Sequence, residues 1–71
     1  MEDADYIRKV GEAIKKARKE QGITQMDLAD ACNFEKQNMQ RLESGRTNPT
    51  IKTLLKIARA LDIELIDLLK F

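Results

Sequence analysis

Residues 24–45, with the sequence TQMDLADACNFEKQNMQRLESG, constrain the fold more than any other stretch of this chain. They predict two short helices, at about 25–32 and 35–43. Thr24 has the position and chemistry of an N-cap for the first of them. Asn33 falls between the two helices, and asparagine tolerates a positive φ better than most other non-glycine residues. The stretch therefore predicts two helices joined by a tight turn.

The remaining residues predict three more helices, at about 6–20, 51–61 and 64–70. Gly22 is expected to end the first in a left-handed conformation, and Thr50 to cap the fourth. No segment alternates with period two for long enough to form a strand, so the fold class is all-α with a compact five-helix bundle. The apolar residues expected to face the core are Ile7, Val10, Ile14, Ala17, Leu28, Ala29, Cys32, Phe34, Met39, Leu42, Ile51, Leu54, Leu55, Ala58, Leu61, Leu65, Leu68 and Leu69.

The length of 71 residues predicts one domain, residues 1–71, with a single modest core. Aromatic residues make up 4% of the chain, which argues against stacking platforms for single strands or RNA. No apolar run is long enough to span a membrane, and the acidic N-terminus lacks the apolar core of a signal peptide. We therefore expect a cytoplasmic protein whose residues 1–5 are disordered.

Cys32 is the one cysteine, and histidine is absent. We therefore expect no disulfide within the chain, no metal and no cofactor. Cys32 is expected to be a small buried hydrophobe, with a redox switch as the alternative. The chain also has no nucleophile beside a base and no phosphate loop, so we expect no enzymatic activity.

Positive charge is concentrated in one part of the chain, although the net charge is only +1. Residues 34–56 carry five basic and two acidic groups, a local charge of +3. The other parts, residues 1–33 and 57–71, each carry one more acidic than basic group. A solvated surface would explain charge alone, but the order of the residues favours nucleic acid as the partner.

Three motifs, ITQMDLAD, MQRLESGRTNP and TLLKIARALDI, occur in this order and together resemble the Cro/C1-type helix-turn-helix family, the lambda-repressor-like regulators. The resemblance covers about residues 7–70 and places the helix-turn-helix at about 24–43. It implies a sequence-specific regulator of transcription, a repressor or autoregulator, that binds duplex DNA. It also implies a homodimer on a palindromic or pseudo-palindromic operator.

The resemblance implies base contacts from the helix at about 35–43. Lysine and arginine can reach guanine O6 and N7 in the major groove, and glutamine can pair with adenine. A polar solvent face is the alternative interpretation of the same residues. Glu35 could cap this helix or accept a hydrogen bond from cytosine, and capping is favoured. The implied base-contacting residues are Lys36, Gln37, Gln40 and Arg41.

The resemblance also implies contacts to the DNA backbone. Gln25 lies at the start of a helix, where free amides and the helix dipole favour a phosphate, and in the family this glutamine also braces the start of the recognition helix. Arg46 and Thr47 could clamp one phosphate and set register without reading sequence. The alternative for Gln25 is an ordinary exposed helix residue, and the alternative for the loop at Arg46 and Thr47 is a plain connection between helices. The implied backbone-contacting residues are Gln25, Asn38, Arg46, Thr47, Asn48 and Lys52.

Two further pairs of residues, Arg18 with Glu43 and Ile66 with Phe71, have expected structural roles. Arg18 and Glu43 match a pair that the family often forms, so they imply a partly buried ion pair that orients the recognition helix. Asn33 stands where the family often has glycine, which is a departure from its pattern. Ile66 and Phe71 are left over after the core is filled and predict a dimer face, although Phe71 could instead close the end of the bundle.

A second class of function remains open, namely an antitoxin-like or other protein-binding module with a partner such as a toxin and only secondary DNA binding. A protein-binding surface would favour exposed aromatic or aliphatic residues on the helix at about 35–43. The donor-rich side chains of that helix favour DNA instead.

Overall fold

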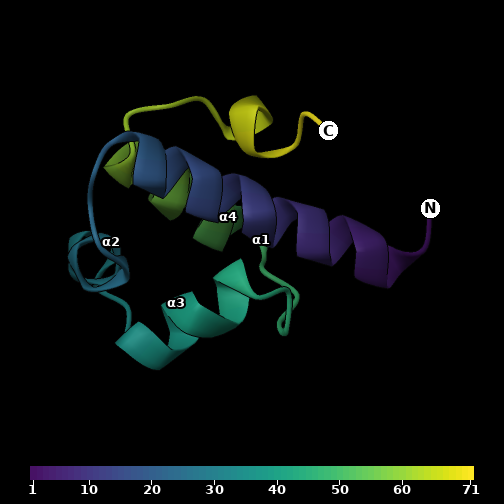
Figure 1. Cartoon of the computed structure of the whole chain (residues 1–71), viewed down its shortest axis with the longest axis horizontal. Coiled ribbons are helices and arrows are strands. Elements are labelled where there is room, and N and C mark those ends of the chain that lie inside the picture. The colour runs from purple at the N-terminus through teal and green to yellow at the C-terminus, as the bar shows by residue number, and fades with distance from the viewer.

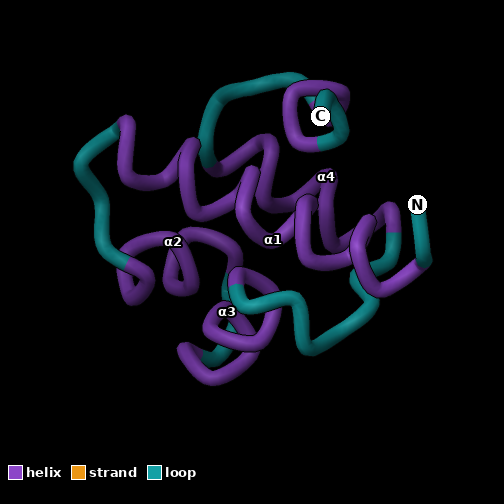
Figure 2. The backbone as a smooth tube through the Cα atoms, turned by 45° about the vertical axis from the view of Figure 1, so that its right-hand side comes forward, coloured by secondary structure: helices purple, strands orange, loops and turns teal.

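Four α-helices and one short 3₁₀-helix make up the computed structural model, which describes all 71 residues. The elements are α1 (Asp3–Glu20), α2 (Gln25–Cys32), α3 (Lys36–Glu43), α4 (Ile51–Ala60) and η1 (Leu65–Leu68). The long α1 crosses the middle of the molecule, with α2 and α3 on one side and the C-terminal turn on the other (Figure 1). Short loops join the helices, and no strand is present (Figure 2).

The all-α class is confirmed, but the count of five α-helices is wrong. The last element is a single 3₁₀ turn with Glu64 as its N-cap. The Leu69 N–H donates to the Ile66 carbonyl at 2.9 Å, a bond across three residues rather than four. Leu68 is buried, whereas Leu69 is 40% exposed and lies outside the core. The chain therefore turns once over α1 and α4 instead of adding a helix.

The N-terminus is more ordered than the sequence led us to expect. Helix α1 begins at Asp3 rather than Tyr6, so residues 3–5 are helical and not disordered. Glu2 is the N-cap, and its backbone N–H donates to the Asp5 carboxylate at 3.3 Å. Acidic residues in the first turn also interact favourably with the helix dipole. The negative charge that predicted disorder instead stabilises the start of this helix.

A single core of twelve buried apolar residues holds the helices together. Helix α4 contributes Leu54, Ile57 and Ala58, and its C-cap residue Leu61 continues their spacing of three and four. Ile57 is fully buried although it was not among the expected core residues. Ile51 was expected there, yet it is 58% exposed at the first position of α4.

None of the helices has both the length and the apolar character needed to cross a membrane.

Candidate nucleic-acid interface

Helix α2 begins with a reciprocal cap. The Thr24 hydroxyl accepts a hydrogen bond from the Asp27 N–H, and the Asp27 carboxylate accepts one from the Thr24 N–H, both at 3.0 Å. These bonds satisfy two donors at the helix end. They also hold the pKa of the Asp27 carboxyl below its ordinary value of 3.8. The start of α2, and with it Gln25, is therefore fixed in direction.

The turn between α2 and α3 depends on one left-handed residue. Asn33 ends α2 with φ of 59° and ψ of 39°, as its place at the turn led us to expect. The chain then bends so that the Phe34 N–H donates to the Ala29 carbonyl at 2.8 Å. Ala29 is fully buried and Phe34 packs against the core. Asparagine meets the backbone requirement that glycine often meets in the family.

Helix α3 has two chemically distinct faces. Met39, Leu42 and Glu43 are buried on the inner face. On the outer face, no side chain hydrogen-bonds or pairs within the chain, so their donors and acceptors are free for a ligand. Glu35 is the N-cap residue of α3, but its side chain makes no capping bond. The outer face consists of Lys36, Gln37, Asn38, Gln40 and Arg41.

Buried charges connect α3 to α1 and α2. The Arg18 guanidinium donates to both carboxylate oxygens of Glu43, at 2.7 and 3.0 Å, and to the Ile23 carbonyl at 2.8 Å. The Gln25 amide donates to the Glu43 carboxylate at 2.9 Å. The Glu43 side chain is 2% exposed, so these donors replace water around it.

Gln25 therefore braces the end of α3, at Glu43, and not its start as expected. The buried carboxylate is a stronger acceptor than any backbone group at the start of α3. The amide oxygen of Gln25 makes no hydrogen bond within the chain. Gln25 and Lys36 line the same shallow hollow beside the start of α2.

Two glycines allow the backbones of α1 and α3 to touch. A Cβ atom on Gly11 would lie 2.4 Å from the Leu42 carbonyl oxygen and 2.8 Å from that of Glu43. Gly45 follows α3 with φ of +74°, and a Cβ there would lie 2.8 Å from the Cα atom of Arg8. Neither contact was predicted from the sequence, because a glycine shows no distant partner by itself. The C-terminal end of α3 thus rests directly on α1.

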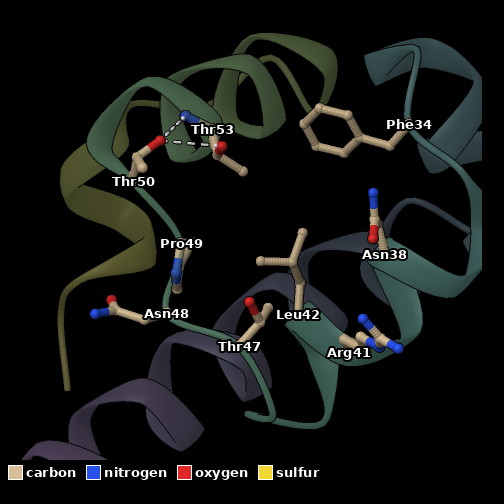
Figure 3. A pocket seen from close by; sticks show the side chains of 9 residues that line it. All are labelled: Phe34, Asn38, Arg41, Leu42, Thr47, Asn48, Pro49, Thr50 and Thr53. Carbon is tan, nitrogen blue, oxygen red and sulfur yellow. Dashed lines mark hydrogen bonds between the residues drawn. The ribbon is translucent and has the colours of Figure 1, made fainter.

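A cavity of about 240 Å³ opens between α3, the loop after it and the start of α4 (Figure 3). Asn38 and Arg41 line one wall, whereas Thr47 and Asn48 line the wall formed by the loop. Seven of its nine lining residues are not hydrophobic. The nine are Phe34, Asn38, Arg41, Leu42, Thr47, Asn48, Pro49, Thr50 and Thr53.

A second hollow, without any apolar residue, lies on the other side of Arg41 and also contains Gln37, Gln40 and Arg46. The structure thus groups the predicted DNA-contacting residues around the outer face of α3. Lys52 is exposed on the first turn of α4 and lines neither hollow.

The turn η1, which contains Ile66, and the C-terminus of the chain lie on the side of α1 opposite α3 (Figures 1 and 2). Ile66 is 61% exposed. The Phe71 ring packs at a tilt against Tyr6, with 5.9 Å between the ring centroids, and half of its surface remains exposed. Tyr6 was not among the predicted residues, because its contact with Phe71 joins the two ends of the chain.

A family model described as Helix-turn-helix matches residues 14–68. An uncharacterized HTH-type transcriptional regulator, y4dJ of Sinorhizobium fredii, is 36% identical over 64 residues, which cover 90% of this chain and 83% of that protein. The immunity repressor of Bacillus phage phi105 is 40% identical over 55 residues, but these are 78% of this chain and only 38% of the repressor.

Solved structures agree with the sequence comparison. The restriction-modification controller protein C.AhdI from Aeromonas hydrophila superposes with a TM-score of 0.85 and 32% identity, over 92% of this chain and 97% of that one. The controller protein C.Esp1396I superposes with a TM-score of 0.82 and 35% identity, over 89% of this chain and 82% of that one.

Proposed function

The chain belongs to the Cro/C1-type helix-turn-helix family of DNA-binding transcriptional regulators, and from this premise we propose that it is a repressor or autoregulator that binds its operator as a dimer. The observation that carries the proposal is the outer face of α3, where donor-rich side chains have no partner within the chain. Such a face matches the donors and acceptors that base pairs present in the major groove.

The first turn of α3 enters the groove deepest in this arrangement, so Lys36 and Gln37 carry most of the sequence discrimination. Gln40 and Arg41 add contacts further along the helix. Each good bidentate contact contributes about 1–3 kcal/mol of discrimination between bases. The buried links from Glu43 to Arg18 and Gln25 support this role, because they hold α3 rigidly on the other helices.

Backbone contacts flank the base contacts. Gln25 binds one phosphate through its backbone N–H, which lies at the start of α2. Arg46, Thr47 and Asn48 bind the strand that passes the cavity beside α3, together with Asn38 and Lys52. These contacts set register and orientation without reading sequence.

A two-fold dimer would place two copies of α3 about 34 Å apart, one turn of DNA. Support for the interface comes from Ile66 and Phe71, which expose apolar surface on the side away from α3, next to Tyr6. The same exposed residues favour the second candidate function, in which a protein partner such as a toxin covers them. Sedimentation of the purified chain separates the two: a dimer that Ile66→Asp dissociates supports the first, and a parent monomer at micromolar concentration supports the second.

Selection from random-sequence duplex DNA tests the main proposal. The parent should enrich a two-fold symmetric motif, which Lys36→Ala/Gln37→Ala alters or loses. Lys16→Ala, which removes the same charge from the exposed side of α1, is the control and should enrich the parent motif. Weak binding without a motif, with only a steep dependence on salt, would reduce the activity to phosphate attraction and contradict the proposal.

A further inference from the structure

The exposed side of α4 carries a row of positive charge that the proposed DNA contacts use only at its first residue. Lys52, Lys56 and Arg59 are spaced by four and three residues, so they share one helix face. All three are exposed and none has a carboxylate within 4.0 Å. We call these three residues the α4 basic face.

Neighbouring acids do not neutralise this face. Helix α4 contains no acidic residue. Asp30 on α2 and Asp62 after α4 form no ion pair with it. Elsewhere on the surface, Arg8 pairs with two carboxylates on α1 and Lys70 pairs with Asp67. A face kept only for solubility would mix both signs, as α1 does.

The α4 basic face is continuous with the outer face of α3. The Lys56 ammonium lies 5.6 Å from the centroid of the Phe34 ring, a cation–π arrangement that holds it beside the turn before α3. Phe34 and Thr53 line the same cavity as Asn38 and Arg41 (Figure 3). Positive charge therefore extends from α3, past this cavity, to α4.

We propose that the α4 basic face is a second phosphate-binding surface, which contacts the DNA backbone in the flank outside the base pairs that α3 contacts. The seven residue steps from Lys52 to Arg59 give this face a length of about 10 Å. About three phosphates of one strand fit along that distance. An acidic protein would also complement the charge, but continuity with α3 favours DNA. The inference rests on the proposed function, and Lys56 and Arg59 are its new contacts.

The test uses the full chain and the motif recovered by selection, in two duplexes. One contains the motif alone, and the other adds ten base pairs on each side. Affinity for each is measured by fluorescence anisotropy between 50 and 200 mM salt, for the parent and for Lys56→Gln/Arg59→Gln. The control, Lys9→Gln/Lys16→Gln, removes the same charge from α1. These two lysines lie about 140–160° around the helix axis from Gly11, the residue that faces α3.

On the long duplex, each protomer of the bound dimer loses two phosphate contacts, four in all, which should reduce the slope of log affinity against log salt by about 3.6. The ratio of parent to variant affinity should then be about 150-fold larger at 50 mM than at 200 mM salt. On the short duplex, the affinity and salt slope of the α4 variant should equal those of the parent. The control variant should equal the parent on both duplexes.

Equal salt slopes for the parent and the α4 variant on the long duplex would overturn the inference, as would an equal loss on both duplexes. In either case motif binding by the parent would leave the proposed function intact. Absence of any selected motif would instead overturn the proposed function itself. Unchanged DNA binding together with loss of a bound acidic protein would assign the face to that partner and also overturn the inference.

Discussion

Replacing Gly11 with alanine should move α3 and reduce discrimination between DNA sequences more than it reduces stability. The added Cβ would lie 2.4 Å from the Leu42 carbonyl oxygen, whereas ordinary contacts begin at 3.4 Å. The two helices must therefore separate by about 1 Å. Only backbone atoms of α3 lie against Gly11 at this point, so no flexible side chain can move aside to make room.

Two opposing effects set the cost in stability. Alanine is favoured over glycine inside a helix by about 1 kcal/mol. Overpacking a well-packed contact costs about 1–3 kcal/mol. The free energy of unfolding should therefore fall by about 0–2 kcal/mol, and the domain should remain folded.

The effect on DNA recognition is larger, since a hydrogen bond lengthened by about 1 Å is lost. Loss of one bidentate base contact from α3 removes about 1–3 kcal/mol of discrimination. The ratio of affinities for the selected motif and for random sequence should fall by about tenfold or more. Affinity for random sequence should change little, because phosphate contacts tolerate small displacements.

Gly22→Ala is the matched control. The same atom is added in open space, but φ of +69° makes alanine unfavourable by about 1–2 kcal/mol. It should lower stability without changing the affinity ratio. Urea unfolding and anisotropy titrations compare the two variants. If Gly11→Ala keeps the parent's affinity ratio, or if Gly22→Ala loses it equally, the reasoning is refuted. Should Gly11→Ala not fold, Gly45→Ala crowds the same interface against Arg8 and should lower the ratio.

Three further predictions concern single sites. Arg18→Met should lower the free energy of unfolding, measured in urea, by about 3–5 kcal/mol, because it leaves the buried Glu43 carboxylate with only the Gln25 amide as a donor. The double variant Arg18→Met/Glu43→Leu should recover most of this loss, and a loss below about 1 kcal/mol for Arg18→Met alone would contradict the prediction. Burial raises the pKa of the Cys32 thiol, so a disulfide reagent should modify it more slowly at pH 8 in the folded chain than in urea, and equal rates would count against the prediction. The pKa of the Asp27 carboxyl is lower in the folded chain than its ordinary value of 3.8, so the ionised carboxylate stabilises the fold above that pH and this effect is lost as pH falls through the folded pKa. Thermal melts should therefore show a weaker loss of stability below pH 4 for Asp27→Asn than for the parent, and parallel curves would exclude this cap as the cause.

Features of the fold that depend on neighbouring residues were predictable from the sequence. Thr24 caps α2, Gly22 is left-handed and Asn33 has a positive φ, as expected, because turn and cap chemistry is local. The positions of α2 and α3 were also predicted to within one residue. The outer and inner faces of α3 follow from the spacing of Met39 and Leu42.

Features that depend on distant atoms were not predictable in this way. The role of Gly11 is set by carbonyl groups at the end of α3, far along the chain. Gln25 turns to Glu43 because of a buried carboxylate, and Tyr6 meets Phe71 only after the bundle closes. The apolar pattern of residues 64–70 suited a helix, but it did not show that one 3₁₀ turn would suffice.

The most direct test of the central claim, that α3 reads the operator, combines variants of the protein with variants of the DNA. Every base pair of the selected motif is substituted in turn, and the affinity of each duplex is measured for the parent and for Gln37→Ala. The account predicts that substitutions cost the parent about 1–3 kcal/mol at contacted positions and that Gln37→Ala becomes indifferent at one position in each half-site. A uniform loss of affinity for all duplexes, or no change at any position, would contradict it.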